Sequence, residues 1–460
     1  MKALADPDRL LGVGLVAIRA QYAIPSDFPP EVLAEAERTK RRAPAEHADR
    51  TALEFVTLDP ASATDLDQAF LIEPAGADLI LHYALADIGW FVPPGGAMEA
   101  EAWARGLTFY LPDGKARLYP AALSEAAASL LPDGPRPAIV ASVRCDPDGR
   151  VRLAGVERAV IRSRAKLAYE TVDVAEVPHL AEFAARMRRG EDARGAARID
   201  SPEQDVERDA GGRFRLSLRP WPASATANSA LSLAANVAIA EALFAAGTGL
   251  FREMPPPDER AVRRLRLTAR ALGLAWPENA TLAQFERTLD PATPAGAAFQ
   301  FAVRRAGNGA HYAPFVPGHT PWHAALGATY THATAPMRRL ADRYVLEAAL
   351  AVANGHPVPE NCAQAFARLP AVMDAADARE AAVERAVIDL AEAALLEGRE
   401  GETFAAVVTD RDAHGARIQL SELPIVARVN ARQVAAGDEV RVRLIEADPV
   451  RRSLRFVRVN

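Results

Sequence analysis

The sequence contains little cysteine. Cys145 and Cys362 are its only two, they lie far apart, and neither has a second cysteine at the spacing of a metal site. This excludes a disulfide framework and a cysteine zinc site. It is typical of a reducing compartment, so we expect a cytoplasmic protein.

The chain also lacks a net positive charge and a long uninterrupted apolar segment. Its formal net charge of −6 argues against a surface coated with basic residues, although it leaves room for a local basic channel. The first residues have no apolar core of a signal peptide, and the most apolar stretch, 231–251, is interrupted by Asn236 and Glu241. We therefore predict a buried helix at 231–251 and no membrane association.

An acidic stretch follows the first pattern that is typical of a strand. Phe55, Val56 and Leu58 indicate a strand, and Asp59, Asp65 and Asp67 then lie within nine residues. Carboxylates this close repel one another, and a divalent cation would neutralise them. A solvated acidic turn is the alternative, because aspartate is a common turn residue, and the spacing alone does not decide between the two.

The stretch 55–69, FVTLDPASATDLDQA, resembles the signature TIDPxxAxDLDDA of the ribonuclease II/R family of exoribonucleases. In that family the matching acidic residues surround magnesium and the scissile phosphate. The resemblance implies Mg²⁺, or Mn²⁺, bound by four side chains: Asp59, Asp65, Asp67 and Gln68. Gln68 stands where the family normally has a fourth aspartate, so the site carries one negative charge fewer. The resemblance also makes Asp67 the leading catalytic residue.

A second block, YTHATAPMRRLAD at 330–342, is similar to the family's YxHFTSPIRRYAD. Pro336 is expected to open a helix, which would place Arg338 and Arg339 in its first turn, near N–H groups that favour anions. We assign Arg338 to the scissile phosphate, as a second catalytic residue. Arg339 is expected either to bind substrate or to form a salt bridge, and His332 either to contact RNA or to form hydrogen bonds in the core.

Two tyrosines are substrate-binding candidates by the same resemblance. Tyr110, in FYLPDG, matches a residue that stacks on a base near the 3′ end of the RNA, although a tyrosine at such a position commonly packs in a core. Tyr169 closes a basic segment and matches a position near the ribose, where a hydroxyl distinguishes RNA from DNA.

The end of the chain predicts a long helix at 371–397 and then short alternating strands. These strands are typical of a five-stranded OB barrel and resemble an S1 domain. We therefore expect a mixed α/β (α+β) protein with three parts: a helical N-terminal cap at 1–45, an RNB-type catalytic domain at 46–398 and an S1-type RNA-binding domain at 399–460. Because the resemblance begins near Asp27, we expect this protein to lack the two cold-shock domains that often precede the catalytic domain in this family.

The resulting hypothesis is a monomeric 3′-to-5′ exoribonuclease. It would hydrolyse single-stranded RNA to nucleoside 5′-monophosphates with Mg²⁺ and without an organic cofactor. One alternative is an RNA-binding protein with a degenerate RNB site, because Gln68, Ile199, Ser229 and Ala230 all depart from the family pattern. Another is a metal phosphoesterase for small molecules, which would leave the barrel and the stacking tyrosine unexplained.

Overall fold

The computed structural model describes most of the chain. The described residues are 10–197, 203–208, 214–219, 222–290, 293–306, 309–412, 415–430, 434–435 and 437–459. Ile199 lies outside them.

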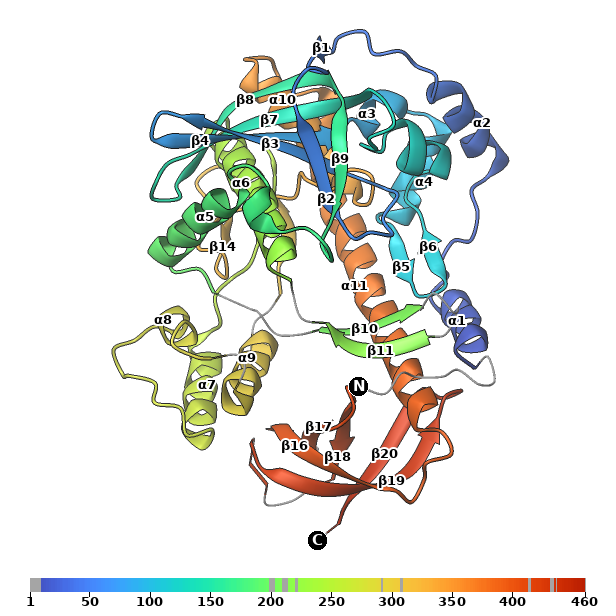
Figure 1. The fold of residues 1–460 in the computed structure, drawn as a ribbon, viewed down its shortest axis with the longest axis vertical. Coiled ribbons are helices and arrows are strands. Elements are labelled where there is room, and N and C mark those ends of the chain that lie inside the picture. The colour runs from blue at the N-terminus through green and yellow to red at the C-terminus, as the bar shows by residue number, and fades with distance from the viewer. Residues whose placement is uncertain are drawn as a thin grey trace.

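A seven-stranded sheet forms the upper part of the molecule (Figure 1). Its order is β1-β8-β7-β4-β3-β2-β9, and its strands are β1 (Ala48–Asp49), β2 (Phe55–Asp59), β3 (Gln68–Ala75), β4 (Asp78–Ala86), β7 (Arg136–Cys145), β8 (Val151–Ile161) and β9 (Ser163–Ala168). The pairs β1–β8 and β2–β9 are parallel, and the other pairs are antiparallel. Alternating apolar residues such as Leu79, Leu81 and Tyr83 are buried, which explains why β4 lies inside this sheet.

The parallel pair β2–β9 positions the acidic stretch. β2 ends at Asp59, and the chain beyond β9 returns to it, since the Tyr169 backbone N–H donates to the Asp59 carbonyl at 3.1 Å. The predicted strand at 55–58 and the turn after it are thereby confirmed. Because parallel strands end at the same edge of a sheet, Asp59 and Tyr169 lie together.

Helices pack against the sheet and connect its parts. They are α2 (Pro30–Thr39), α3 (Ile88–Phe91), α4 (Ala97–Arg105), a π-helical turn (Leu123–Ala127), a 3₁₀ turn (Val174–Glu176), α5 (Leu180–Arg194), α6 (Ala223–Ala245) and α10 (Leu340–Ala353). Short strands pair outside the sheet: β5 (Phe109–Leu111) with β6 (Gly114–Ala116), β10 (Glu203–Arg208) with β11 (Phe214–Arg219), β12 (Leu250–Glu253) with β13 (His311–Pro314), and β14 (Trp322–His323) with β15 (Ala328–Thr329). Helices α7 (Glu259–Ala271), α8 (Leu282–Glu286) and α9 (Pro294–Ala306) enclose a small core of their own.

The apolar stretch predicted as a buried helix belongs to α6. Its length and composition would allow it to cross a membrane, but 56% of the relevant window is buried inside the fold. Leu231, Ile239 and Leu243 are fully buried in the core that α6 shares with the sheet. The prediction of a buried helix is confirmed for 231–245 and is wrong for 246–251, because α6 ends at Ala245 and β12 begins at Leu250.

Helix α11 (Glu360–Leu396) joins the upper part to the C-terminal barrel (Figure 1). The predicted start at residue 371 is wrong, because the helix begins eleven residues earlier and contains Pro370. Cys362, Phe366 and Leu369 are buried in the first turns, so tertiary packing outweighs the lost hydrogen bond at the proline. The barrel itself is closed, in the order β16-β17-β18-β20-β19, as predicted. Its strands are β16 (Thr403–Asp412), β17 (Gly415–Leu420), β18 (Val426–Val429), β19 (Glu439–Asp448) and β20 (Ser453–Val459).

The two N-terminal helices do not form one cap. Leu11 and Leu15 of α1 (Leu10–Gln21) pack into the core that contains α11 and the barrel. Val32 and Ala36 of α2 pack into the core beneath the sheet. Each helix has an apolar stripe, but the two stripes pack against different cores. The sequence of the segment does not show which core each stripe contacts.

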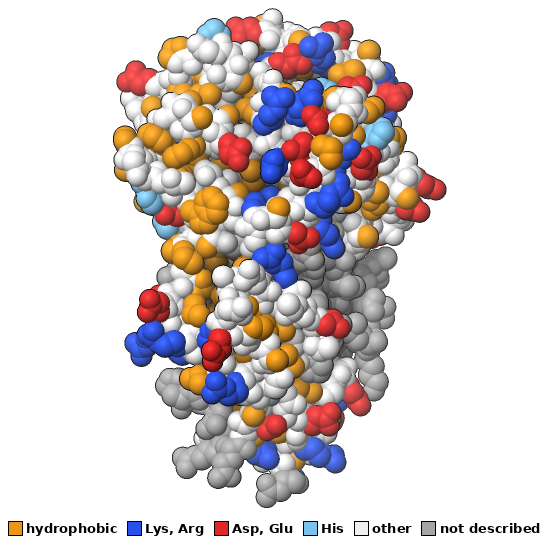
Figure 2. Space-filling view, turned by 90° about the vertical axis from the view of Figure 1, so that its left-hand side faces the viewer, with side chains coloured by type: hydrophobic (Ala, Val, Ile, Leu, Met, Phe, Trp, Pro, Cys, Tyr) orange, Lys and Arg blue, Asp and Glu red, His pale blue; other side chains and the backbone are white. Residues whose placement is uncertain are grey.

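Charged side chains of both signs are interspersed on the face drawn in Figure 2. On the coloured part of that face, no continuous basic field forms. This agrees with the expectation from the net charge.

Candidate active site

The two sequence blocks that carry the signature residues meet at Asp67. Its side chain is 5% exposed, and its Oδ1 accepts a hydrogen bond of 2.7 Å from the Met337 backbone N–H. The Arg338 Nε lies 3.7 Å from Oδ2. Burial raises the pKa of Asp67 to about 7, and the Arg338 guanidinium opposes that rise. A buried carboxylate thus faces a guanidinium that is 44% exposed.

Asp59 is the second carboxylate at this point. It ends β2, and no hydrogen bond to its side chain is found among the described residues. Burial raises its pKa to about 7, Arg338 opposes the rise, and Asp65 adds to it. Lys166 also opposes the rise and binds the Ala61 and Ala63 carbonyls at 2.7 and 2.5 Å, so it holds the loop between Asp59 and Asp65.

Asp65 is held by the β5–β6 hairpin. Its Oδ1 lies 2.7 Å from the Lys115 Nζ, and its Oδ2 accepts from the Tyr110 hydroxyl at 2.8 Å. Sequence reasoning missed Lys115, because nothing in the local pattern shows that the hairpin folds over the acidic loop. The only indication in the sequence was that a basic residue, Lys115, lies two residues after the β5–β6 turn.

Gln68 begins β3, and both ends of its amide have partners. Its Nε2 donates to the Thr334 carbonyl at 2.7 Å, and its Oε1 accepts from the Tyr83 hydroxyl and from Ser232 Oγ, the latter at 3.2 Å. A carboxylate at this position would lose the donor and face the Thr334 carbonyl. The structure therefore explains a glutamine at position 68 by its hydrogen bonds. Metal binding by Gln68 stays a prediction.

The segment before α10 differs from the prediction. Helix α10 begins at Leu340, so Pro336 and Arg338 lie in a preceding turn and Arg339 is only the N-cap. The backbone N–H groups of Ala335 and Met337 already donate to Asp342 and Asp67, at 2.7 Å each. These carboxylates hold the turn outside the helix.

Arg339 and His332 face protein partners. Arg339 Nε and Nη2 bind the Asp342 carboxylate at 3.0 and 2.8 Å, so the structure favours the salt bridge for this residue over contact with substrate. His332 Nδ1 lies 2.8 Å from the Tyr312 hydroxyl, and burial together with Arg339 lowers the histidine pKa well below its usual value. Of the alternatives for His332, the structure shows the hydrogen bond in the core, and RNA contact stays a prediction.

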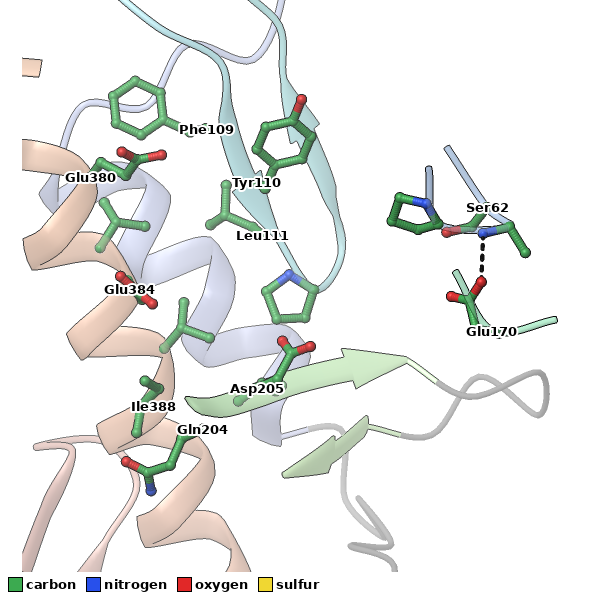
Figure 3. Close-up of a pocket in the computed structure, with 16 residues that line it drawn as sticks. Ser62, Phe109, Tyr110, Leu111, Glu170, Gln204, Asp205, Glu380, Glu384 and Ile388 are labelled. Carbon is green, nitrogen blue, oxygen red and sulfur yellow. Dashed lines mark hydrogen bonds between the residues drawn. The ribbon is translucent and has the colours of Figure 1, made fainter. Parts of the chain in front are cut away.

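Tyr110 borders a cavity of about 840 Å³ between the β5–β6 hairpin, β10, α11 and the loop at 60–62 (Figure 3). Its side chain is 52% exposed although its hydroxyl is bound to Asp65. Phe109 and Leu111 are buried instead, as alternation in a strand requires. A hydrogen bond of 3.1 Å from the Ala61 N–H to Glu170 ties the loop to the chain beyond β9. The ring is thus open for stacking next to the buried carboxylates.

Tyr169 lies on the other side of Asp59. Its hydroxyl accepts a hydrogen bond of 2.7 Å from the Asn228 Nδ2, and burial with the nearby Asp59 raises its pKa to about 12. The hydroxyl proton therefore remains available to an acceptor. Ser229 and Ala230, which depart from the family pattern, follow Asn228 in α6.

The donor set fits a hard divalent cation in part. Asp59 and Asp67 supply carboxylate oxygens whose negative charge is unfavourable when buried, and Mg²⁺ or Mn²⁺ would relieve that cost. Within the described part of the chain, no group of three His, Cys, Asp or Glu side chains is placed to hold one ion. The remaining ligands would have to be water or substrate oxygens, as is usual for Mg²⁺.

Comparisons with known proteins find similar sequences and a similar fold. The chain is 28% identical to Ribonuclease R of Aquifex aeolicus over 448 residues, which cover 89% of this chain and 62% of that protein. It is 25% identical to Ribonuclease R of Thermotoga maritima over 523 residues, which cover 100% of this chain and 72% of that protein. The structure of Mycoplasma genitalium RNase R in complex with ribose methylated single-stranded RNA shares the fold, with a TM-score of 0.85, 19% identity and coverage of 98% of this chain and 78% of that one.

Family models match both parts of the chain. Residues 402–459 match the RNase II-type exonuclease C-terminal S1 domain, and they include the closed barrel. Residues 48–353 match the RNB domain, and they include the sheet, Asp59, Asp67 and Arg338. The chain therefore belongs to the RNB family.

Proposed function

We propose that this chain is a 3′-to-5′ exoribonuclease that hydrolyses single-stranded RNA to nucleoside 5′-monophosphates. The observation that carries the proposal is the meeting of the two signature blocks, since Met337 and Asp67 are 270 residues apart and share a hydrogen bond. This contact places the exposed Arg338 guanidinium beside the buried carboxylate of Asp67 and near the half-buried one of Asp59, within the RNB match. Such a pairing suits a phosphodiester, which brings negative charge and needs both a cation and a guanidinium.

The proposed cation is Mg²⁺, because RNB exoribonucleases generally depend on a divalent metal. When bound, it would lower the pKa of a water molecule and stabilise the leaving oxygen. Asp59 and Asp67 are the residues that would hold it.

The side chains of this chain then have distinct tasks. Arg338 offsets the charge that develops on the phosphate while a water oxygen bonds to phosphorus and the bond to the 3′ oxygen breaks. The leaving 3′ oxygen receives a proton, so a nucleoside 5′-monophosphate and a shortened RNA with a 3′ hydroxyl remain. The Tyr110 ring stacks on the terminal base, and the Tyr169 hydroxyl donates to the 2′ oxygen.

The other expectations become part of the same proposal. We place the enzyme in the cytoplasm as a monomer without an organic cofactor. The buried free thiols of Cys145 and Cys362 support the cytoplasmic location, because it is a reducing compartment.

A second candidate function is RNA binding by a degenerate RNB site. It is favoured by the hydrogen bonds that occupy Gln68 and by the Lys115 contact of Asp65, since both leave fewer oxygens for a metal. On this alternative the barrel would bind RNA and no hydrolysis would follow.

One experiment separates these functions. Purified protein is incubated with 5′-labelled single-stranded RNA and Mg²⁺, with EDTA, a 3′-phosphorylated RNA and a single-stranded DNA of the same sequence as controls. The exonuclease predicts a ladder that shortens from the 3′ end, stops with EDTA and releases 5′-monophosphates. RNA that is bound but never shortened would establish the second candidate instead.

A further inference from the structure

The ammonium group of Lys115 is surrounded by three oxygen acceptors. Its Nζ lies 2.7 Å from Asp65 Oδ1, 2.8 Å from Glu125 Oε1 and 3.3 Å from Thr64 Oγ1. An ammonium has three N–H donors, so these three acceptors satisfy it completely. The side chain is 19% exposed. Lys115 therefore has no donor left for a substrate phosphate.

The acceptors of Lys115 are themselves fixed. Arg117 Nη2 binds both oxygens of Glu125, at 3.0 and 2.9 Å. Thr64 Oγ1 donates to Glu125 at 3.0 Å and can accept from Lys115 at the same time. The network of Lys115, Glu125, Arg117 and Thr64 holds the ammonium against Asp65.

Both oxygens of Asp65 already accept a hydrogen bond. Lys115 binds Oδ1, and the Tyr110 hydroxyl donates to Oδ2 at 2.8 Å. The Lys115 ammonium offsets part of the negative charge of Asp65, so Asp65 attracts a metal ion less than a carboxylate without such a partner would. This leaves Asp59 and Asp67, whose two negative charges match one divalent cation.

We propose that Lys115 is a built-in counterion for Asp65, so that this centre takes a single divalent ion, between Asp59 and Asp67, and not two. The inference rests on the proposed function, because it presumes that the carboxylates bind a metal. It revises one expectation from the sequence, since Asp65 is then bound to Lys115 and is not a metal ligand.

Counting bound Mn²⁺ tests the inference without reference to activity. Mn²⁺ is titrated into the purified protein, with and without an RNA oligonucleotide whose last linkage is a non-hydrolysable methylenephosphonate. Free Mn²⁺ is measured by electron paramagnetic resonance. We expect one bound ion in wild type and in Lys115→Arg, and two in Lys115→Met. The double variant Lys115→Met with Asp65→Asn should return to one ion, because the second ion needs the freed Asp65.

The outcomes separate the inference from the proposed function. Two ions in wild type, or one ion in Lys115→Met, would overturn the role of Lys115 and leave a metal-dependent nuclease intact. No bound ion in wild type would overturn the metal centre itself and the inference with it. Thermal melting checks the fold of each variant, and Lys115→Gln replaces Lys115→Met if the methionine variant does not fold.

Discussion

At the scale of single residues, the site is defined by two carboxylates, Asp59 and Asp67, whose negative charge is destabilised by loss of solvent. The pKa values of Asp59 and Asp67 both rise to about 7, so either side chain gains from a nearby positive charge. Arg338 supplies part of that charge, since its Nε lies 3.7 Å from Asp67 Oδ2. At this distance the negative charge of Asp67 is only partly neutralised, so a cation would stabilise it further. The first predictions concern these side chains and the tyrosine beside them.

Asp67→Asn is expected to abolish hydrolysis and preserve the fold. Asparagine keeps an Oδ1 that accepts the Met337 N–H, but it removes the negative charge that would hold the cation. We expect the rate to fall by roughly 10²-fold or more, the size typical for groups that stabilise a transition state. Single-turnover cleavage of labelled RNA measures the rate, and the melting temperature serves as the control. A rate within a few-fold of wild type would refute the assignment of Asp67.

Tyr169→Phe is expected to reduce discrimination between RNA and DNA. The Asn228 amide already donates to the hydroxyl, which directs the hydroxyl proton toward another acceptor, and the 2′ oxygen is the one we propose. A hydrogen bond between neutral groups contributes about 0.5–1.5 kcal/mol, so the ratio of kcat/KM for RNA over DNA should fall by up to about tenfold. If this ratio is the same in both proteins, Tyr169 does not read the ribose.

At the scale of elements, α11 and α1 connect the site to the barrel. Helix α11 packs on α1 and on the barrel, and Glu392 near its end accepts from the Val426 N–H at 2.8 Å and from the Gln204 amide at 2.7 Å. Helix α1 approaches α11 so closely that a Cβ on Gly14 would lie 2.5 Å from Leu390. Both contacts join segments that are far apart in the chain.

Glu392→Gln is expected to make stability less dependent on pH. Burial raises the pKa of Glu392 to about 7, so its contribution to stability is present below its unfolded value of 4.5 and is lost as the pH rises through 7. At 1.36 kcal/mol per pKa unit the loss is about 3 kcal/mol. The melting temperature should therefore fall less between pH 5 and pH 8 in Glu392→Gln than in wild type. The exposed Glu278→Gln is the matched control, and equal slopes in wild type and Glu392→Gln would contradict this account.

Arg19→Gln is expected to weaken substrate binding through the hairpin. Arg19 of α1 binds both carboxylate oxygens of Asp113, at 3.1 and 2.8 Å, and the Gly114 carbonyl at 3.1 Å, at the turn of the β5–β6 hairpin that carries Tyr110. A partly exposed pair contributes up to about 1 kcal/mol, so KM should rise up to about fivefold with kcat nearly constant. Arg38→Gln on α2 is the control. A lower kcat with an unchanged KM would show that α1 does not act through base stacking.

At the scale of the whole molecule, a sheet domain with the buried carboxylates stands above a small barrel, and α11 spans the two (Figure 1). Tyr110, Asp67 and Tyr169 lie in the upper part, and Arg441 and Arg443 are exposed on β19 of the barrel. Since phosphates attract guanidinium groups without regard to sequence, we expect the barrel to add RNA affinity at a distance from the chemistry.

The double variant Arg441→Gln with Arg443→Gln is expected to bind RNA less tightly and with a weaker salt dependence. Each phosphate contact on a single strand contributes about 0.7 to the slope of log K against log salt, so the slope should fall by about 1.4. Fluorescence anisotropy at several salt concentrations measures it. Arg150→Gln, on the turn between β7 and β8, is the control; an equal effect of this variant would mean that the barrel is not the RNA surface.

The barrel, the buried α6 and the strand before the acidic turn could be predicted from the sequence, because alternation and apolar runs are local properties. The start of α11 could not, because Pro370 ends a helix by local rules and only packing of Phe366 and Leu369 overrides them. The same holds for α1 and α2, whose apolar stripes do not specify a partner.

The residue pattern identified which side chains could do the chemistry: closely spaced aspartates, an arginine pair after Pro336, and two tyrosines. How most of them are used depends on tertiary packing. Arg339 pairs with Asp342, Gln68 binds Thr334 and Tyr83, and Asp65 binds Lys115. Arg339 and Asp342 are three residues apart at the start of α10, so their contact is local. Gln68 and Asp65 instead contact residues of other elements, 15 to 266 positions away, and these distances are set by how the elements pack.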